Sequence, residues 1–195
     1  QRNLGNLLKE SGRHLEAATA LRAAIALDPK FVEAYINLGV VLTTLREHGE
    51  AEKIFRRALA LDPANVAALR NLIVIYSMAE RSEDALALVD RLIRARGETA
   101  DDLRDRGHML QTLGRLDEAE QSYKRALTLD PSHGAAHEAL AKLGWRRSNG
   151  DFLRPLTVAI DRIPDNAELA MIKGKILTQA GRFDEAVAAR INAET

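Results

Sequence analysis

The sequence predicts an all-α solenoid, in which antiparallel helix pairs are stacked as repeats. Three Asp-Pro pairs fall on one 34-residue grid, the third lying two periods beyond the second: Asp28-Pro29, Asp62-Pro63 and Asp130-Pro131. Proline cannot continue a helix and pushes the residue before it out of the helical region. Each pair therefore marks the end of one repeat at the same phase.

Small and apolar residues recur on the same grid. One slot holds alanine in five units, at Ala17, Ala51, Ala85, Ala119 and Ala186. Four residues later stand Leu21, Phe55, Val89 and Tyr123, and seven residues after the first set stand Ala24, Ala58 and Ala126. Spacings of four and seven residues place these side chains on one face of a helix. The pattern indicates one amphipathic helix here and room for a second in each unit.

Reading the grid in order gives six units, at residues 1–31 (partial), 32–65, 66–99, 100–133, 134–166 (irregular) and 167–195 (partial). The predicted helix pairs cover residues 1–11 and 15–27, 33–46 and 49–61, 67–79 and 83–95, 100–113 and 117–129, 134–147 and 151–162, and 167–180 and 184–193. Turns within pairs are expected at Gly12, Gly114 and Gly181, because glycine accepts the left-handed conformation that closes a helix.

Two units depart from the regular pattern. In residues 66–99, Ile73 and Leu92 replace small residues, and Gly97 stands where proline is expected. In residues 134–166 the segment from Gly144 to Gly150 fits the grid only if one residue is deleted, after which Pro164 returns to phase. We expect this fifth helix pair to be spread more widely than the others.

The chain resembles the tetratricopeptide repeat family, whose unit is a helix-turn-helix of 34 residues. The best copies are residues 32–65, with Tyr35, Leu38, Gly39, Leu42, Ala51, Phe55, Ala58 and Pro63, and residues 100–133, with Leu103, Gly107, Leu110, Gly114, Ala119, Tyr123, Ala126 and Pro131. The resemblance implies a right-handed superhelical solenoid. It also implies a concave groove, lined by the first helix of each pair, that binds a protein or peptide.

Mapping the family's groove positions onto this chain gives the candidate partner-binding residues Asn3, Asn6, Asn37, Val40, Arg70, Asn71, Met78, Arg104, Asp105, His108, Lys142 and Trp145. Asn3, Asn37 and Asn71 are spaced by one period, so their amides form a predicted ladder along the groove. This arrangement is similar to the repeat arm of O-GlcNAc transferases, where such asparagines grip extended peptides. The alternative is that asparagine is merely common at this position and bonds neighbouring repeats.

A second recognition mode is matched only in part. Arg2, Asn6 and Asn37 resemble the carboxylate clamp that holds the C-terminal tails of heat-shock chaperones. Ala67 and Asn71 stand where the third unit of such a clamp carries lysine and arginine, and only Arg70 supplies charge there. The groove peptide is therefore favoured over a terminal carboxylate.

Composition limits the partners and the compartment. The chain has 28 basic and 28 acidic side chains, so it lacks the charge excess expected of a protein that binds nucleic acid or an anionic membrane. It has no cysteine, which suits a reducing cytoplasm. No apolar run approaches the roughly 20 residues that span a bilayer. Alanine content and the Gly-Arg turns favour a bacterial source.

Catalytic patterns are weak, and no enzyme activity, cofactor or metal is predicted. His133 and His137 have i, i+4 spacing but lack an evident third ligand, so solvated histidines are expected. The glycines are dispersed repeat positions and form no phosphate loop. The arginine and glutamate clusters are read as solvated outer faces.

The predicted function is a scaffold for protein–protein interaction. The alternative is a non-catalytic arm of a larger enzyme of glycosyltransferase, sulfotransferase or 2-oxoglutarate oxygenase type, with this sequence a piece of the whole. A third hypothesis is self-association through exposed solenoid ends, made by Leu4, Leu8 and Leu21 at one end and Ile176, Leu177 and Val187 at the other.

Overall fold

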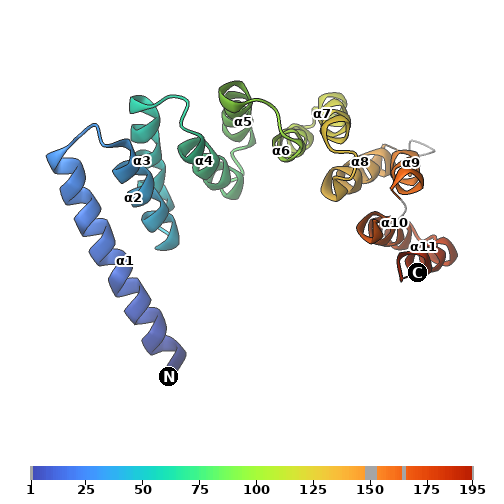
Figure 1. Ribbon diagram of the computed structural model, residues 1–195, viewed down its shortest axis with the longest axis horizontal. Helices are drawn as coiled ribbons and strands as arrows, with labels where there is room; N and C mark the ends of the chain where they lie inside the picture. The colour runs from blue at the N-terminus through green and yellow to red at the C-terminus, as the bar shows by residue number, and fades with distance from the viewer. Residues whose placement is uncertain (1, 148–152, 164–165, 195) are drawn as a thin grey trace. The chain divides into compact units, whose positions relative to one another are not determined.

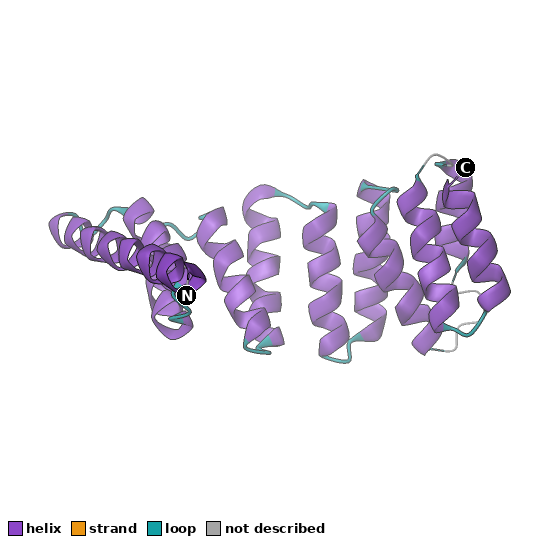
Figure 2. Cartoon of the chain, turned by 90° about the horizontal axis from the view of Figure 1, so that it is seen from below, coloured by secondary structure: helices purple, strands orange, loops and turns teal. Residues whose placement is uncertain are grey.

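The computed structural model describes the backbone of residues 2–147, 153–163 and 166–194, and side chains from residue 12 to 189 within those ranges. These residues form helices joined by short turns and contain no strand (Figures 1 and 2). The helices are α1 (Arg2–Leu27), α2 (Val32–Thr44), α3 (His48–Leu61), α4 (Val66–Met78), α5 (Ser82–Arg96), α6 (Ala100–Thr112), α7 (Leu116–Leu129), α8 (Gly134–Arg146), α9 (Arg154–Arg162), α10 (Ala167–Gln179) and α11 (Phe183–Glu194). The all-α repeat fold is confirmed.

The chain forms two compact units, residues 1–97 and 98–195. In the first unit α2 pairs with α3 and α4 with α5, while the first helices of the two pairs, α2 and α4, also touch. In the second unit α6 pairs with α7 and α10 with α11, and the first helices α6, α8 and α10 touch in succession. Within each unit, neighbouring repeats therefore share one layer of first helices.

The predicted helix ends from α2 to α8 agree with the structure to within two residues. The prediction for the first pair was wrong, because α1 runs without a break through Gly12. Glycine permits a turn but does not require one. Its cost inside a helix is only about 1 kcal/mol, so a helix continues where nothing stabilises the turn.

The residue at the turn within the helix pair has a left-handed backbone in four other repeats. Arg46 has φ 63° and Glu80 has φ 56°, while Gly114 and Gly181 both have φ 75°. The last two confirm the predicted glycine turns. Since Arg46, Glu80 and Gly114 are spaced by one period, the conformation belongs to the repeat, and the two non-glycine residues adopt it against their own preference.

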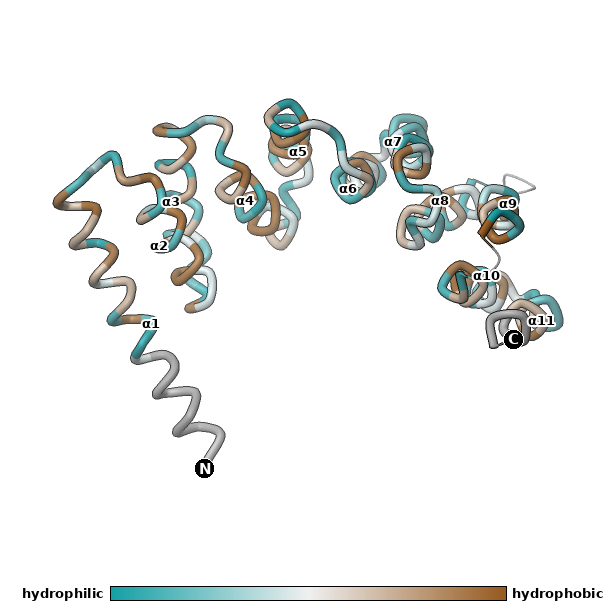
Figure 3. Tube along the Cα trace, viewed as in Figure 1, coloured by the Kyte–Doolittle hydropathy of each residue, from teal (hydrophilic) through white to brown (hydrophobic). Residues whose placement is uncertain are grey.

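Apolar side chains hold the helix pairs together, and hydrophobic and hydrophilic residues alternate along the coloured part of the tube in Figure 3. Phe55 and Tyr123, one in each unit, are fully buried against Gly39 and Gly107. At the equivalent positions of the third repeat stand a larger and a smaller residue, Ile73 and Val89, both buried. The departure at Ile73 is thus matched by a smaller side chain on the second helix.

The C-terminal helices have a core of their own. Leu153, Leu156, Leu169, Ile176 and Leu177 are buried together with alanines of α8, α9 and α11. Ile176 and Leu177, predicted to form an exposed solenoid end, are fully buried because α11 covers α10. That part of the self-association hypothesis was wrong, whereas Val187 is exposed as predicted. Leu4 and Leu8 lie outside the described side chains.

Candidate interaction faces on the first helices

In the first unit, exposed apolar side chains stand on the first helices α2 and α4. Val40 on α2 and Val74 on α4 occupy the same repeat position and are 43% and 53% exposed. Met78, one turn beyond Val74, is 62% exposed. An α-helix places residues four apart on one face, so Arg70, Val74 and Met78 follow one another along α4. Val74 and Met78 thus form a short exposed apolar row on α4, with Arg70 one turn before it.

The predicted asparagine ladder lies on the same helices. Asn37 is exposed on α2, and Asn71 is half-buried at the equivalent position of α4. The side-chain amide of Asn71 donates to the carbonyl oxygen of Ala67, 2.8 Å away on its own helix. That bond uses one amide hydrogen and leaves the amide oxygen as the accepting group. The remaining ladder residue, Asn3, lies outside the described side chains, as do Arg2 and Asn6.

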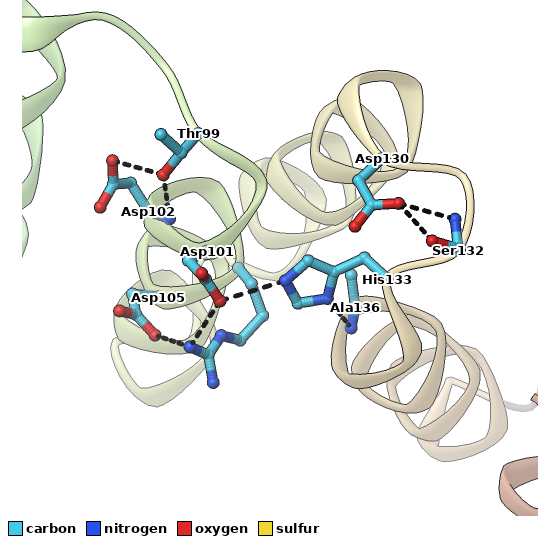
Figure 4. Close-up of polar contacts among 9 residues, drawn as sticks. Thr99, Asp101, Asp102, Asp105, Asp130, Ser132, His133 and Ala136 are labelled. Carbon is cyan, nitrogen blue, oxygen red and sulfur yellow. Dashed lines mark hydrogen bonds and ion pairs between the residues drawn. The ribbon is translucent and has the colours of Figure 1, made fainter. Parts of the chain in front are cut away.

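In the second unit, charged residues on α6 form ion pairs with one another (Figure 4). A guanidinium nitrogen of Arg104 lies 3.4 Å from Asp101 and 3.0 Å from Asp105. Burial raises the pKa of the Asp105 carboxyl, an effect that Arg104 opposes and that the neighbouring Asp101 and Asp102 strengthen. Arg104 is therefore held by two carboxylates rather than presented alone to a partner. His108, one turn further along, is exposed.

Charged side chains on α8 and α10 also form ion pairs with one another. Glu138 accepts from Lys142 at 2.6 Å and from Lys175 of α10 at 2.8 Å. Lys142, followed by Lys175, holds the pKa of Glu138 below its ordinary value. Glu138 thus offsets one of the two lysine charges, and the cluster keeps a net charge of +1. Near the end of α8, Trp145 is 41% exposed and supplies a large aromatic surface. The structure thus gathers the predicted residues into two sets, one in each compact unit.

Both histidines of the i, i+4 pair have structural partners, so the expectation that they are solvated was wrong. His133 caps α8: its Nδ1 accepts from the backbone N–H of Ala136 at 3.2 Å, and its Nε2 lies 3.2 Å from Asp101. His137 is buried, and its Nε2 lies 2.9 Å from the carbonyl oxygen of Pro131. A carbonyl can only accept, so Nε2 carries the proton.

A signal for His137 was present in the repeat grid. His137 stands three periods after Tyr35, whose hydroxyl donates to the carbonyl oxygen of Pro29 at 3.3 Å. The two side chains make the same contact, six residues back, in different repeats. Burial lowers the pKa of His137, because the charged imidazolium would lose its hydration.

Among the side chains that the structure describes, no group of three or more His, Cys, Asp or Glu residues is placed to hold a metal ion. None of the helices in the described part of the chain is both long enough and apolar enough to cross a bilayer.

Three family models match the chain, all described as tetratricopeptide repeat. They match residues 2–66, 42–104 and 100–133. Among curated proteins, the TPR repeat-containing thioredoxin TTL4 of Arabidopsis thaliana is 33% identical over 90 residues, which are 46% of this chain and 13% of that protein. The chain therefore matches a small part of that relative.

Solved structures with similar folds cover most of the chain. A tetratricopeptide repeat protein from Parabacteroides merdae superposes with a TM-score of 0.72 at 23% identity, over 97% of this chain and 78% of the other. MamA from Desulfovibrio magneticus gives 0.67 at 19% identity, over 82% and 91%. YrrB, described as a TPR protein with an unusual peptide-binding site, gives 0.63 at 20% identity, over 90% and 91%. At these low identities, the superpositions show a shared fold.

Proposed function

Because this chain belongs to the tetratricopeptide repeat family, we propose that it binds an extended segment of another protein along its first helices. Proteins of this fold serve in general as scaffolds for protein–protein interaction, without chemistry of their own. The finer proposal concerns where the segment lies and what holds it. It rests on the first unit, where the exposed apolar and amide side chains repeat together.

The observation that carries the proposal is the pairing of Val40 with Val74. Both are apolar, both are about half exposed, and they stand at one position of consecutive first helices. Isolated exposed apolar residues are ordinary on protein surfaces, but apolar residues that repeat with the fold, together with Met78, offer a partner several apolar contacts on neighbouring first helices. Such contacts suit the apolar side chains of an extended peptide.

Asn37 and Asn71 would hold the backbone of that peptide. An amide side chain offers both a donor and an acceptor, which match the N–H and C=O groups of an extended chain. Since the bond from Asn71 to Ala67 uses one amide hydrogen, the amide oxygen of Asn71 is suited to accept from a peptide N–H. Binding of this kind reads little of the peptide's sequence.

The second unit would contribute differently. The ion pairs of Arg104 and of Lys142 leave little net charge to attract an acidic segment. An exposed ion pair contributes about 0–1 kcal/mol. A ligand carboxylate that took the place of Asp105 or Glu138 would therefore form a pair of similar strength and gain little affinity. Trp145 would be the strongest anchor on this face, because aromatic residues that a partner covers dominate the binding energy of many interfaces.

The experiment begins with selection of binding peptides from a random 12-residue library against the wild-type chain. Fluorescence anisotropy then gives the Kd of the selected peptides for the wild type, for the Asn37→Ala/Asn71→Ala double variant and for Val74→Asp. The double variant should bind about tenfold more weakly, because two hydrogen bonds of about 1 kcal/mol each are lost in part. Val74→Asp should bind more weakly still.

The matched control is Arg57→Ala, which removes an exposed side chain from α3, a second helix. It should leave the Kd unchanged. Selected peptides that bind the Asn37/Asn71 and Val74 variants as tightly as the wild type would overturn the proposed site. Circular dichroism of each variant shows that the helices are retained, so that weaker binding is not loss of fold.

The second candidate function is that of an arm attached to a larger enzyme. The observation in its favour is the curated relative, a thioredoxin by name, of which the matched repeats make up 13%. We propose that these repeats position a partner for a domain encoded beside them. Sequencing the whole gene tests this: an adjoining enzyme domain supports it, and a reading frame made only of repeats contradicts it.

A further inference from the structure

The second unit holds an apolar pocket of about 520 Å³ between α7, α8 and α9. Leu127 of α7, Leu140 of α8 and Val158 of α9 line it, with Pro155 and Ile163 at the two ends of α9. This volume lies within the roughly 300–1,000 Å³ typical of small-molecule sites. None of its lining residues belongs to the interaction faces proposed above.

The pocket has a smaller counterpart in the first unit. A smaller hollow of about 320 Å³ there is lined by Leu59 and Leu72, two periods before Leu127 and Leu140. Tyr76 also lines the hollow, and the guanidinium of Arg81 lies 4.1 Å from the centre of its ring. At the position equivalent to Tyr76, the second unit has Gly144. The aromatic ring that lines the first hollow is therefore missing from the second.

Two cations stand at the apolar wall, Lys124 of α7 and Arg162 of α9. Lys124 lies 2.6 Å from Glu120 on its own helix. Among the residues that the structure describes, Arg162 has no ion-pair partner, and its side chain is exposed. The pocket thus combines an apolar body with an available positive charge at its edge, and Thr128 and His137 also line it.

We propose that this pocket binds a small amphiphilic carboxylate, an alkyl chain ending in one carboxyl group. The chain would lie against Leu127, Leu140 and Val158, where its burial supplies most of the affinity at about 25 cal/mol per Å² of apolar surface. The carboxylate would lie at Arg162, whose guanidinium can donate two parallel hydrogen bonds to it. Lys124 adds a second positive charge nearby.

The test is a two-dimensional amide NMR titration of the 195-residue chain with sodium decanoate, kept below the concentration at which it forms micelles. The expected result is saturable binding with shift changes confined to α7, α8 and α9. Decyltrimethylammonium, with the same chain length and the opposite charge, is the ligand control and should bind at least about threefold more weakly. Shifts that do not saturate, that spread over other helices, or that are equal for both ligands would overturn the proposal.

Variants of Val158 separate the pocket from general surface binding. Val158 is 39% exposed, so the helix tolerates substitution there. Val158→Asp places a carboxylate in the pocket and should weaken decanoate binding at least about tenfold, whereas Val158→Leu keeps the apolar wall and should bind within about twofold of the wild type. Arg162→Gln should weaken binding about threefold. Unchanged affinity in a folded Val158→Asp variant would also refute the site.

Discussion

The ring of Phe55 lies against the backbone of Gly39, so closely that a Cβ at residue 39 would stand 2.6 Å from Cε1 and Cζ of the ring. Tyr123 covers Gly107 in the same way in the second unit, with an even shorter approach. Where Ile73 fills the glycine position, Val89 fills the aromatic one. The two helices of a repeat therefore share a roughly constant volume, divided differently between the facing side chains.

The first prediction concerns this contact. Gly39→Ala forces the ring of Phe55 to move inside a fully buried site, and overpacking of this kind costs about 1–3 kcal/mol. The free energy of unfolding, measured by urea denaturation, should fall by that amount. The double variant Gly39→Ala/Phe55→Leu, which replaces the ring by a smaller aliphatic side chain, should recover some of the loss.

Gly49→Ala is the control for the first prediction. Gly49 lies in α3, and a Cβ there would meet no atom within 4 Å. The alanine variant should be as stable as the wild type, or more stable by up to about 1 kcal/mol, because alanine favours helix. Equal effects of the two substitutions would mean that the Gly39–Phe55 contact does not govern the packing.

Most of the fold could be predicted from the sequence, because the effects of proline and of the recurring alanine act within a single helix. Pro63 and Pro131 end helices by sterics alone, so the bounds of α3 and α7 needed no knowledge of tertiary contacts. Gly12 is different, because glycine allows two conformations and the neighbouring packing chooses between them. The burial of Ile176 likewise depended on α11 folding over α10, which the repeat pattern of α10 alone does not contain.

The second prediction concerns Arg46, which has φ 63° at the turn between α2 and α3. This conformation destabilises a non-glycine residue by about 1–2 kcal/mol. Glycine avoids that cost but loses more conformational entropy on folding than other residues do. Arg46→Gly should therefore leave the free energy of unfolding unchanged or raise it by up to about 1 kcal/mol. Arg57→Gly, inside α3, should lower it by about 1 kcal/mol. Thermal or urea unfolding of the two variants gives the comparison. A large fall in the free energy of unfolding of Arg46→Gly would contradict a left-handed conformation at residue 46.

The third prediction concerns the cap of α8. His133 accepts from the N–H of Ala136, as Asn65 does from Ala68 and Asn166 from Leu169 at the starts of α4 and α10. His133→Asn should keep the cap, while His133→Ala should lower the free energy of unfolding by about 1 kcal/mol. Urea denaturation at pH 7.5 provides the comparison. If asparagine costs as much as alanine, the contact with Asp101 and not the cap stabilises this end.

The candidate site was predicted in part. Family positions located Val40, Met78 and Trp145, all exposed in the structure. The ion pair between Arg104 and Asp105 joins neighbours in sequence, but its effect depends on burial, and the pairing of Glu138 with Lys175 joins two repeats. The pocket beside Leu140 has no aromatic ring at Gly144, where the equivalent position of the first unit has Tyr76. Such features arise between repeats, where a pattern read within one repeat gives no signal.

The fourth prediction follows from the lowered pKa of His137. Burial disfavours the imidazolium, and the nearby His133 acts in the same direction, whereas the Pro131 carbonyl and Asp130 oppose the shift. In an unfolded chain, the pKa of histidine is about 6.5. As the pH falls through that value, the unfolded chain takes up a proton that folded His137 does not. Stability contributed by the neutral ring is therefore complete above about pH 6.5 and is lost below it.

His137→Tyr tests this directly, because tyrosine at the equivalent position 35 makes the same contact and stays neutral throughout this pH range. Urea unfolding of both proteins at pH 7.5, 6.5 and 5.5 gives the difference in free energy of unfolding at each pH. The variant should gain on the wild type as the pH falls, by at most about 1.4 kcal/mol per pH unit. Other titrating groups are shared by both proteins and cancel in the difference. A difference that stays constant from pH 7.5 to 5.5 would mean that burial does not keep His137 neutral.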